Sequence, residues 1–167
     1  KGIETFIKSA SIVSKENSNV NFMMVGRDNT NKNNELVKTL KKEGVLNKFI
    51  LLGESEDIKK QLMMMDVFVL CSKTEGFPNV LAEAMLMQLP CISTNVGDAP
   101  LILEDVGKIL NDNNEFNLAE AIKDLLKKNK LQRQEIGKVS RDRIVRRYSI
   151  DNFTNGYLEL YREIKEI

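Results

Sequence analysis

Histidine and tryptophan are both absent from this chain of 167 residues, and cysteine occurs only twice. Without histidine, these residues cannot carry His-based acid–base catalysis, a Ser-His triad or a His-ligated metal. A metal held by thiolates alone needs more cysteines than Cys71 and Cys91. These absences exclude His-ligated and thiolate-only metal sites from this chain.

An excess of charge of one sign is also missing, since 25 Lys and Arg side chains stand against 24 Asp and Glu side chains. This balance gives no reason to expect nucleic acid as a partner. No apolar run reaches the roughly 20 residues that cross a bilayer. Cys71 and Cys91 each lie at the edge of an apolar, strand-like run, where thiols are usually small buried hydrophobes. With no secretory segment visible, we expect a reduced, cytoplasmic setting.

The length is that of a single domain, and the sequence does not begin with Met. An amphipathic helix starts at once, with apolar residues at helical spacing: Ile3, Phe6, Ile7, Ala10 and Val13. We expect this chain to be a fragment of a longer polypeptide.

Short, almost wholly apolar strands alternate with helices. We expect strands at 20–25, 49–52, 67–71, 91–94 and 108–110. We expect helices up to 16, at 32–43, 57–65 (capped by Ser55), 78–87, near Pro100, and at 118–128, 131–147 and 151–167. This order predicts an α/β fold, a Rossmann-like doubly wound parallel sheet with helices on both faces. Such sheets bind ligands beyond the carboxyl ends of their strands, which is where Gly26, Gly53, Ser72, Glu75 and Gly97 stand.

The stretch from Glu75 to Glu83 is the most informative one. Gly76 and Pro78 exclude a helix interior, and Pro78 is suited to the first helical position, so we expect a helix from 78 to about 87. Phe77, just before it, has no side-chain oxygen to cap the first turn. The amides of Phe77, Asn79 and Val80 are then free, and a helix start with free amides binds anions. A phosphate is the expected guest.

Two carboxylates flank this corner. The helix is apolar on every side except at Glu83, which we expect to be buried and therefore to need hydrogen bonds. Either ligand hydroxyls or a core Lys or Arg would meet that need. Glu83 lies roughly 7 Å beyond the helix start, a distance that suits the ribose of a nucleotide whose diphosphate sits on the amides. Glu75 either faces the other end of the phosphates or is solvated.

The ordered set of motifs resembles the donor site of family-4 retaining glycosyltransferases, which have two domains and the GT-B architecture. The motifs are Lys1-Gly2, Met24-Val25-Gly26, Leu52-Gly53, the segment from Asp66 to Glu83, the segment from Pro90 to Gly97, and Tyr148-Ser149 before a last helix. They cover nearly the whole chain and belong to the C-terminal, nucleotide-sugar-binding domain of the family. The resemblance implies such a domain at 1–148 and, at 149–167, a helix that packs toward a missing N-terminal acceptor domain.

The resemblance also implies roles for single residues. Glu75 and Lys1 would be catalytic, with Glu75 holding sugar hydroxyls and Lys1 helping to neutralise the diphosphate. Glu83 would bind the ribose, and Gly26 and Gly53 would line the base pocket. The full donor-binding set would be Gly26, Arg27, Gly53, Glu54, Ser72, Glu75, Gly76, Phe77, Pro78, Asn79, Val80 and Glu83. The substrate would be a nucleotide-diphosphate sugar, with no metal or other cofactor, in surface polysaccharide or glycolipid synthesis. The fragment alone would bind nucleotide weakly and be inactive.

Three residues depart from the family pattern. Pro78 stands where many members have a second Gly, and Leu101 stands where many have Glu. Gln88 replaces a Gly that ends a helix in the left-handed region, at a cost of about 1 kcal/mol. Arg27 either contacts phosphate or is solvated, and the run of residues 63–65, all Met, is expected to fill the core.

Alternatives stay open. One is another GT-B-like enzyme, an inverting transferase or a sugar-nucleotide epimerase. Another is a non-catalytic flavodoxin or receiver-type module, although the chain lacks the acidic cluster of receivers. The basic run at 127–147, interleaved with Ile136, Val139, Ile144 and Val145, predicts a solvated amphipathic helix, with peripheral contact to anionic lipid at the inner membrane as the second interpretation.

Overall fold

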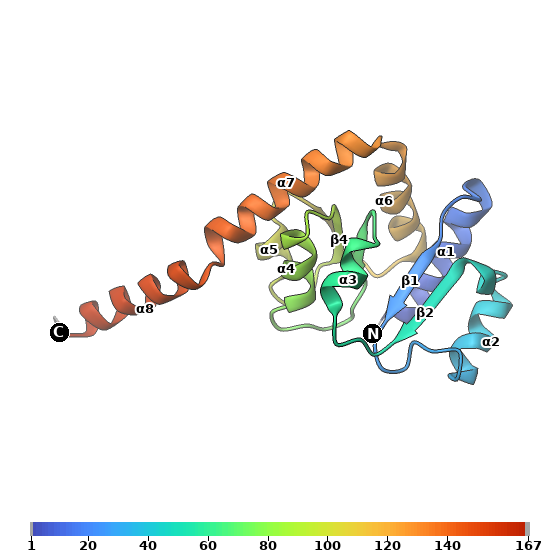
Figure 1. Cartoon of the computed structure of the whole chain (residues 1–167), viewed down its shortest axis with the longest axis horizontal. Helices are drawn as coiled ribbons and strands as arrows, with labels where there is room; N and C mark the ends of the chain where they lie inside the picture. The colour runs from blue at the N-terminus through green and yellow to red at the C-terminus, as the bar shows by residue number, and fades with distance from the viewer. Residues whose placement is uncertain (1, 166–167) are drawn as a thin grey trace.

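The computed structural model describes residues 2–165 and has alternating helices and strands (Figure 1). In chain order the elements are α1 (Ile3–Glu16), β1 (Phe22–Val25), α2 (Asn34–Lys42), the 3-10 helix η1 (Leu46–Lys48), β2 (Phe49–Gly53), α3 (Ile58–Met63), β3 (Phe68–Leu70), α4 (Asn79–Leu86), β4 (Cys91–Thr94), α5 (Ala99–Leu103), β5 (Lys108–Leu110), α6 (Glu115–Lys127), α7 (Lys130–Arg147) and α8 (Ile150–Lys165). Every expected helix and strand is present, and most boundaries shift by one to three residues.

All strand pairs are parallel, as predicted. They form a two-stranded sheet, β1-β2, and a three-stranded sheet in the order β3-β4-β5. The register pairs Phe22 with Phe49 in the first sheet, and Phe68 with Cys91 in the second. The sequence predicted one sheet, whereas the structure has two. β1 and β3 are not paired, and both strands line the same cavity.

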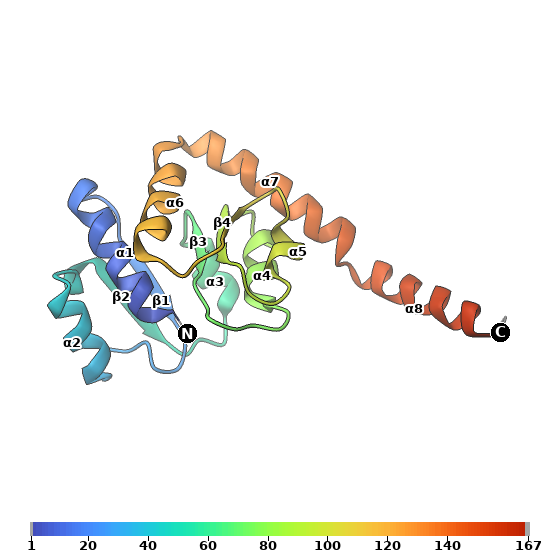
Figure 2. The same cartoon turned by 180° about the vertical axis from the view of Figure 1, so that it is seen from behind.

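Helices cover both faces, which confirms the α/β class. α1 lies behind β1 and β2 in Figure 1 and in front of them in Figure 2, whereas α3 lies on the opposite side. Ala10 and Val13 of α1 pack with Leu118 and Ile122 of α6 in one buried cluster. A second cluster joins α4, α5 and α7 through Met85, Leu103 and other buried residues. These packed layers fix the carboxyl ends of the strands, where the candidate site lies.

The cap of α3 was predicted wrongly. Asp57, not Ser55, is the N-cap, and its side chain accepts a hydrogen bond from the amide of Lys60 at 3.1 Å. Ser55 accepts instead from the amide of Asp57 at 3.3 Å. Both residue types are good caps, so the sequence alone did not separate them.

The core role predicted for the Met run at 63–65 is wrong for two of its residues. Met63 and Met64 are 66% and 58% exposed, because they end a short helix at the surface, and only Met65 packs against the core.

α7 differs in part from the predicted solvated amphipathic helix. Ile144 is buried, but Val139 and Val145 are about half exposed, at 48% and 49%. Some of its basic side chains also hold neighbouring elements. The Arg143 guanidinium donates to the carbonyl of Ile102 at 2.7 Å and pairs with Glu104.

α8 projects away from the body of the molecule (Figure 1). Each of its described residues is exposed, including Ile150 at 80% and Phe153 at 66%. α8 confirms the helix predicted at 151–167 over the described residues, up to Lys165. Within residues 2–165, we find no helix that is both long and apolar enough to span a bilayer.

Candidate functional site

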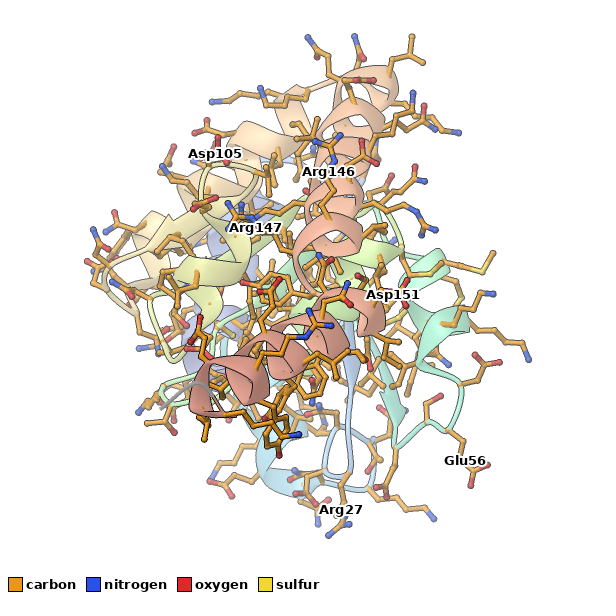
Figure 3. All side chains as sticks on the ribbon, turned by 90° about the vertical axis from the view of Figure 1, so that its left-hand side faces the viewer. Arg27, Glu56, Asp105, Arg146, Arg147 and Asp151 are labelled. Atoms are coloured by element: carbon orange, nitrogen blue, oxygen red, sulfur yellow. The ribbon has the colours of Figure 1, made fainter. Side chains whose placement is uncertain are left out.

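The loops after β1 and β2 are bonded to each other. The amide of Gly26 donates to the carbonyl of Gly53 at 2.7 Å, and both glycines have a positive φ, 135° and 71°. Arg27 and Glu54 form an ion pair of 3.8 Å across the two loops, and both side chains are highly exposed. Figure 3 shows Arg27 at the end of the molecule away from Arg146 and Arg147. Four predicted site residues thus come together at one edge.

The corner before α4 has three unused amides. α4 begins at Asn79, one residue later than predicted, because Pro78 takes the N-cap position with ψ of 86°. The first amide that donates to a backbone carbonyl is that of Leu81, to Pro78 at 2.9 Å. Within residues 2–165, the amides of Phe77, Asn79 and Val80 donate no hydrogen bond. Together with the positive end of the helix, they make an anion-binding geometry.

Gly97 holds the loop of this corner from behind. A Cβ at Gly97 would lie 2.1 Å from the carbonyl oxygen of Gly76, so only glycine permits this approach. The next amide, that of Asp98, donates to the same carbonyl at 3.0 Å. The turn after β4 therefore fixes the backbone at Glu75 and Gly76.

The carboxylate of Glu75 is held by the hydroxyl of Ser72, and Ser72 is in turn held by a second hydroxyl group. The hydroxyl of Ser72 donates to Oε1 of Glu75 at 2.6 Å. The hydroxyl of Thr94, at the end of β4, donates to the carbonyl of Ser72 at 2.7 Å, and Thr94 is only 4% exposed. Thr94 was not among the site residues predicted from the sequence. Its position at the end of the strand next to β3 was the available signal, since parallel strands end at one edge.

The expectation that Glu83 is buried is wrong. α4 buries Leu81, Ala84 and Met85, whereas Glu83 lies on its exposed face. The alternative of a core Lys or Arg partner also fails over the described chain, since no ion pair formed within residues 2–165 includes Glu83. Its carboxylate is therefore open to solvent, about 6 Å along the axis from the start of α4.

One cavity of about 760 Å³ connects the two groups of loops. This volume lies in the range of small-molecule sites. Among the predicted site residues, those that line it are Gly26, Arg27, Glu54, Ser72, Glu75 and Val80. Met64 and Met65 also line it, which brings part of the Met run to the cavity wall.

The first helix enters the same region through Gly2. A Cβ at Gly2 would lie 1.9 Å from the carbonyl oxygen of Cys71, the residue before Ser72. Gly2 therefore packs directly on the end of the strand that leads to the site. Lys1 itself lies outside the described residues.

Burial disfavours the thiolate form of both cysteines. Burial raises the pKa of Cys71 to about 11 and raises the pKa of Cys91 as well. Both are free, with Cys91 buried and Cys71 partly so, which agrees with the predicted role of small hydrophobes. Over residues 2–165, no three Cys, Asp or Glu side chains come together as a metal site.

The sequence pattern of the family described as Glycosyl transferases group 1 matches residues 1–128. The chain belongs to the group 1 glycosyltransferases. Membership of this family excludes the flavodoxin and receiver alternatives. It also agrees with the order of motifs from Gly26 to Glu83.

Two relatives of this chain are named for polysaccharide biosynthesis. The Vi polysaccharide biosynthesis protein VipC/TviE of Salmonella typhi is 40% identical over 89 residues, 52% of this chain and 15% of that protein. The capsular polysaccharide biosynthesis glycosyltransferase CapM of Staphylococcus aureus is 29% identical over 154 residues, 89% of this chain and 39% of that protein. The chain therefore spans well under half the length of these relatives.

Solved glycosyltransferases share the fold. One from Rickettsia africae superposes with a TM-score of 0.84 at 23% identity, over 98% of this chain and 44% of that one. The C-terminal domain of the group 1 protein LpcC from Francisella tularensis gives 0.75 at 26% identity, over 90% and 80%. HepE from Anabaena, solved in complex with UDP, gives 0.79 at 20% identity, over 95% and 44%. The group 1 chain therefore has the Rossmann-like fold of one half of a GT-B enzyme.

Proposed function

We propose that this chain is the donor-binding half of a retaining glycosyltransferase that takes its sugar from a nucleotide-diphosphate sugar. The observation that carries the proposal is the corner before α4, where the amides of Phe77, Asn79 and Val80 lack acceptors within residues 2–165. A diphosphate is a leaving group whose charge grows as the glycosidic bond breaks. Fixed amide donors at a helix start stabilise that charge without reorganisation.

Two exposed carboxylates, on either side of the corner amides, would bind the two ends of the donor. Glu75 lies at the cavity wall with its carboxylate held by Ser72, and in this position it can accept hydrogen bonds from sugar hydroxyls. Glu83 lies along α4 on the other side of the amides, at a distance that suits ribose hydroxyls of the same nucleotide. Neither carboxylate needs to be proton donor or base in this role.

The base then lies toward the loops after β1 and β2. Gly26 and Gly53 keep the backbone close there, and the exposed Arg27–Glu54 pair lines the same cavity. The UDP bound to HepE, which has the same fold, makes UDP the first nucleotide to test. Because amides and carboxylates serve as the ligands, we propose that donor binding needs no metal.

The acceptor side belongs to another part of the full-length protein. The matched relatives and the two-domain neighbours are more than twice as long as the stretch that they share with this chain. We propose that the exposed apolar residues of α8 pack against that other part, and that the product is a surface polysaccharide or glycolipid, as the names of CapM and VipC/TviE suggest.

The test is an NMR amide titration of the 167-residue chain with UDP, GDP and ADP. The proposal expects one nucleotide to shift the amides of Gly26, Gly53 and residues 76–83, and Glu83→Ala to weaken that binding. Glu159→Ala, on the exposed face of α8, is the matched control and should change nothing. A titration in which no nucleotide shifts these amides at millimolar concentration would count against the donor role.

Retention is tested separately in the full-length protein. The anomeric configuration of the product, read by NMR against that of the donor sugar, separates retention from inversion. An inverted product would favour the inverting GT-B alternative while leaving the donor site in place.

A further inference from the structure

Tyr148 contacts the candidate phosphate corner from the end of α7. Its ring lies against that of Phe77, with centroids 5.6 Å apart and planes inclined at 59°. Both residues are partly exposed, Phe77 at 42% and Tyr148 at 39%. Phe77 carries one of the three unused amides and directly precedes Pro78 and Asn79. A contact with the Phe77 side chain can therefore influence the backbone at the start of α4.

The hydroxyl of Tyr148 reaches a second element. It donates to the carbonyl of Leu101, in the middle of α5, at 3.2 Å, and the Arg143 guanidinium donates to the same carbonyl at 2.6 Å. α5 in turn follows Asp98, whose amide donates to Gly76 in the corner loop. Tyr148 thus contacts the loop directly through Phe77 and indirectly through α5.

The loop has few other supports. Residues 73 to 77 are all exposed, and a Cβ at Gly76 would meet nothing within 4 Å. Over the described residues, the supports found are the Ser72 contact to Glu75, the packing of Gly97 and the Asp98 amide bond to Gly76. All of these act at Glu75 or Gly76, and none acts at Phe77. The ring of Tyr148 supplies that missing support.

We infer that Tyr148 is a positioning residue for donor binding: its ring holds Phe77 and thereby sets the direction of the Phe77, Asn79 and Val80 amides. The inference rests on the proposed donor role of these amides. The hydroxyl contributes little to this function, because Arg143 also satisfies the carbonyl of Leu101. The ring is the part that matters.

Figure 3 shows residues around the junction of α7 and α8. Arg146 and Arg147 precede Tyr148 on α7, and Asp151 follows on the first turn of α8. α7 ends where Tyr148 adopts φ of −122° and ψ of 22°. The residue that holds Phe77 is therefore also the one at which the chain turns from α7 toward α8.

The experiment compares Tyr148→Ala and Tyr148→Phe with Phe77→Ala and with the double variant Phe77→Ala/Tyr148→Ala. UDP, with GDP and ADP beside it, is the probe. Tyr148→Ala should weaken nucleotide binding about three- to tenfold, the range that one aromatic pair supplies, while Tyr148→Phe stays within about twofold of the parent. The double variant should bind about as weakly as the weaker-binding single variant, because both substitutions remove the same ring contact.

A second readout needs no ligand. In the free protein, Tyr148→Ala should shift the amide signals of Phe77, Asn79 and Val80, and Tyr148→Phe should leave them close to the parent. Tyr157→Ala, which removes a tyrosine paired with Phe153 on α8, is the control and should leave them unchanged. If Tyr148→Ala does not fold, Phe77→Leu tests the same contact from the other side.

The outcomes are distinct. Unmoved amides in Tyr148→Ala, or losses from Phe77→Ala and Tyr148→Ala that simply add, would overturn the positioning role. If the parent binds none of the three nucleotides, the proposed donor role fails, and the signals of the free protein still decide whether Tyr148 orients the corner.

Discussion

Gly137 of α7 lies directly against the backbone of Gln88, so close that a Cβ at position 137 would stand 1.9 Å from the Gln88 carbonyl oxygen. This contact joins α7 to the end of α4, the helix that begins at the candidate site. Backbone atoms cannot retreat as a flexible side chain would.

We expect Gly137→Ala to destabilise the fold by about 1–3 kcal/mol, because the new methyl group forces α7 away from α4. Urea unfolding followed by circular dichroism measures the loss. Gly156→Ala is the matched control, since a Cβ there meets nothing within 4 Å and α8 gains a better helix former. Equal stability of the two variants would contradict the packing described.

Gln88 has φ of 60°, the left-handed region predicted for this position. Gln88→Gly removes a backbone strain of about 1–2 kcal/mol, which stabilises the fold. It also makes the unfolded chain more flexible, which lowers the stability by about 0.5–1 kcal/mol. We therefore expect a net gain of about 0.5–1 kcal/mol in the free energy of unfolding. Gln88→Ala keeps the strain and should show no gain, which separates backbone relief from loss of the side chain.

Gly97→Ala should weaken nucleotide binding, and this effect on affinity should be larger than its effect on the free energy of unfolding. The new methyl group would lie 2.1 Å from the Gly76 carbonyl and would push the corner loop out of place. We expect binding to weaken by at least about tenfold, or about 1.4 kcal/mol. Gly44→Ala has a comparable positive φ of 72° with open space around it, so it carries the strain without the clash. Calorimetric titration with the nucleotide that binds would show whether only Gly97→Ala loses affinity.

Ser72→Ala tests the support of Glu75. Loss of the hydroxyl at 2.6 Å frees the carboxylate to rotate. Because Glu75 is proposed to hold the sugar and not the nucleotide, UDP should bind unchanged while a bound UDP-sugar loses about fivefold in affinity. UDP-glucose, UDP-galactose and UDP-N-acetylglucosamine are the sugars to compare. Thr39→Val, which removes a hydroxyl on the surface of α2, is the control. An equal loss for UDP and the UDP-sugar would count against the assigned role.

Cys71 gives a pH dependence. Burial raises its pKa from 9.0 to about 11 in the folded chain, so the folded state keeps a proton that the unfolded thiol loses. The stability that this difference contributes is present below about pH 9 and is lost as the pH rises toward about 11. We expect the parent to lose about 1–2 kcal/mol more than Cys71→Ala between pH 8 and pH 10.5 in urea unfolding. A parallel loss in both proteins would assign the effect to other groups.

The sequence predicted the order of elements and the residues at the strand ends because these depend on local pattern. Cys91–Thr94 and Lys108–Leu110 were placed without error, since short apolar runs between turn residues fix a buried strand. The exposure of Glu83 was not predictable in the same way. An apolar helix predicts burial, but which face of α4 meets the core depends on how α7 and α5 pack, and that is a tertiary fact.

Contacts between distant segments were missed for the same reason. The hydroxyl of Thr94 on the carbonyl of Ser72 and the ring of Tyr148 on Phe77 join residues 22 and 71 positions apart. No periodicity shows such pairs. The split between β1 and β3 was missed as well, since each strand by itself has the composition of a central strand.

The arm formed by α8 has a consequence for how the chain melts. Because its side chains are already in water, unfolding α8 exposes little new apolar surface and adds little to the heat capacity of unfolding. The cooperative unit therefore ends near Tyr148, and the arm opens independently of the core. A protease that cuts after Arg146 or Arg147 would meet this boundary first, and would separate the arm from a body whose buried clusters all remain intact.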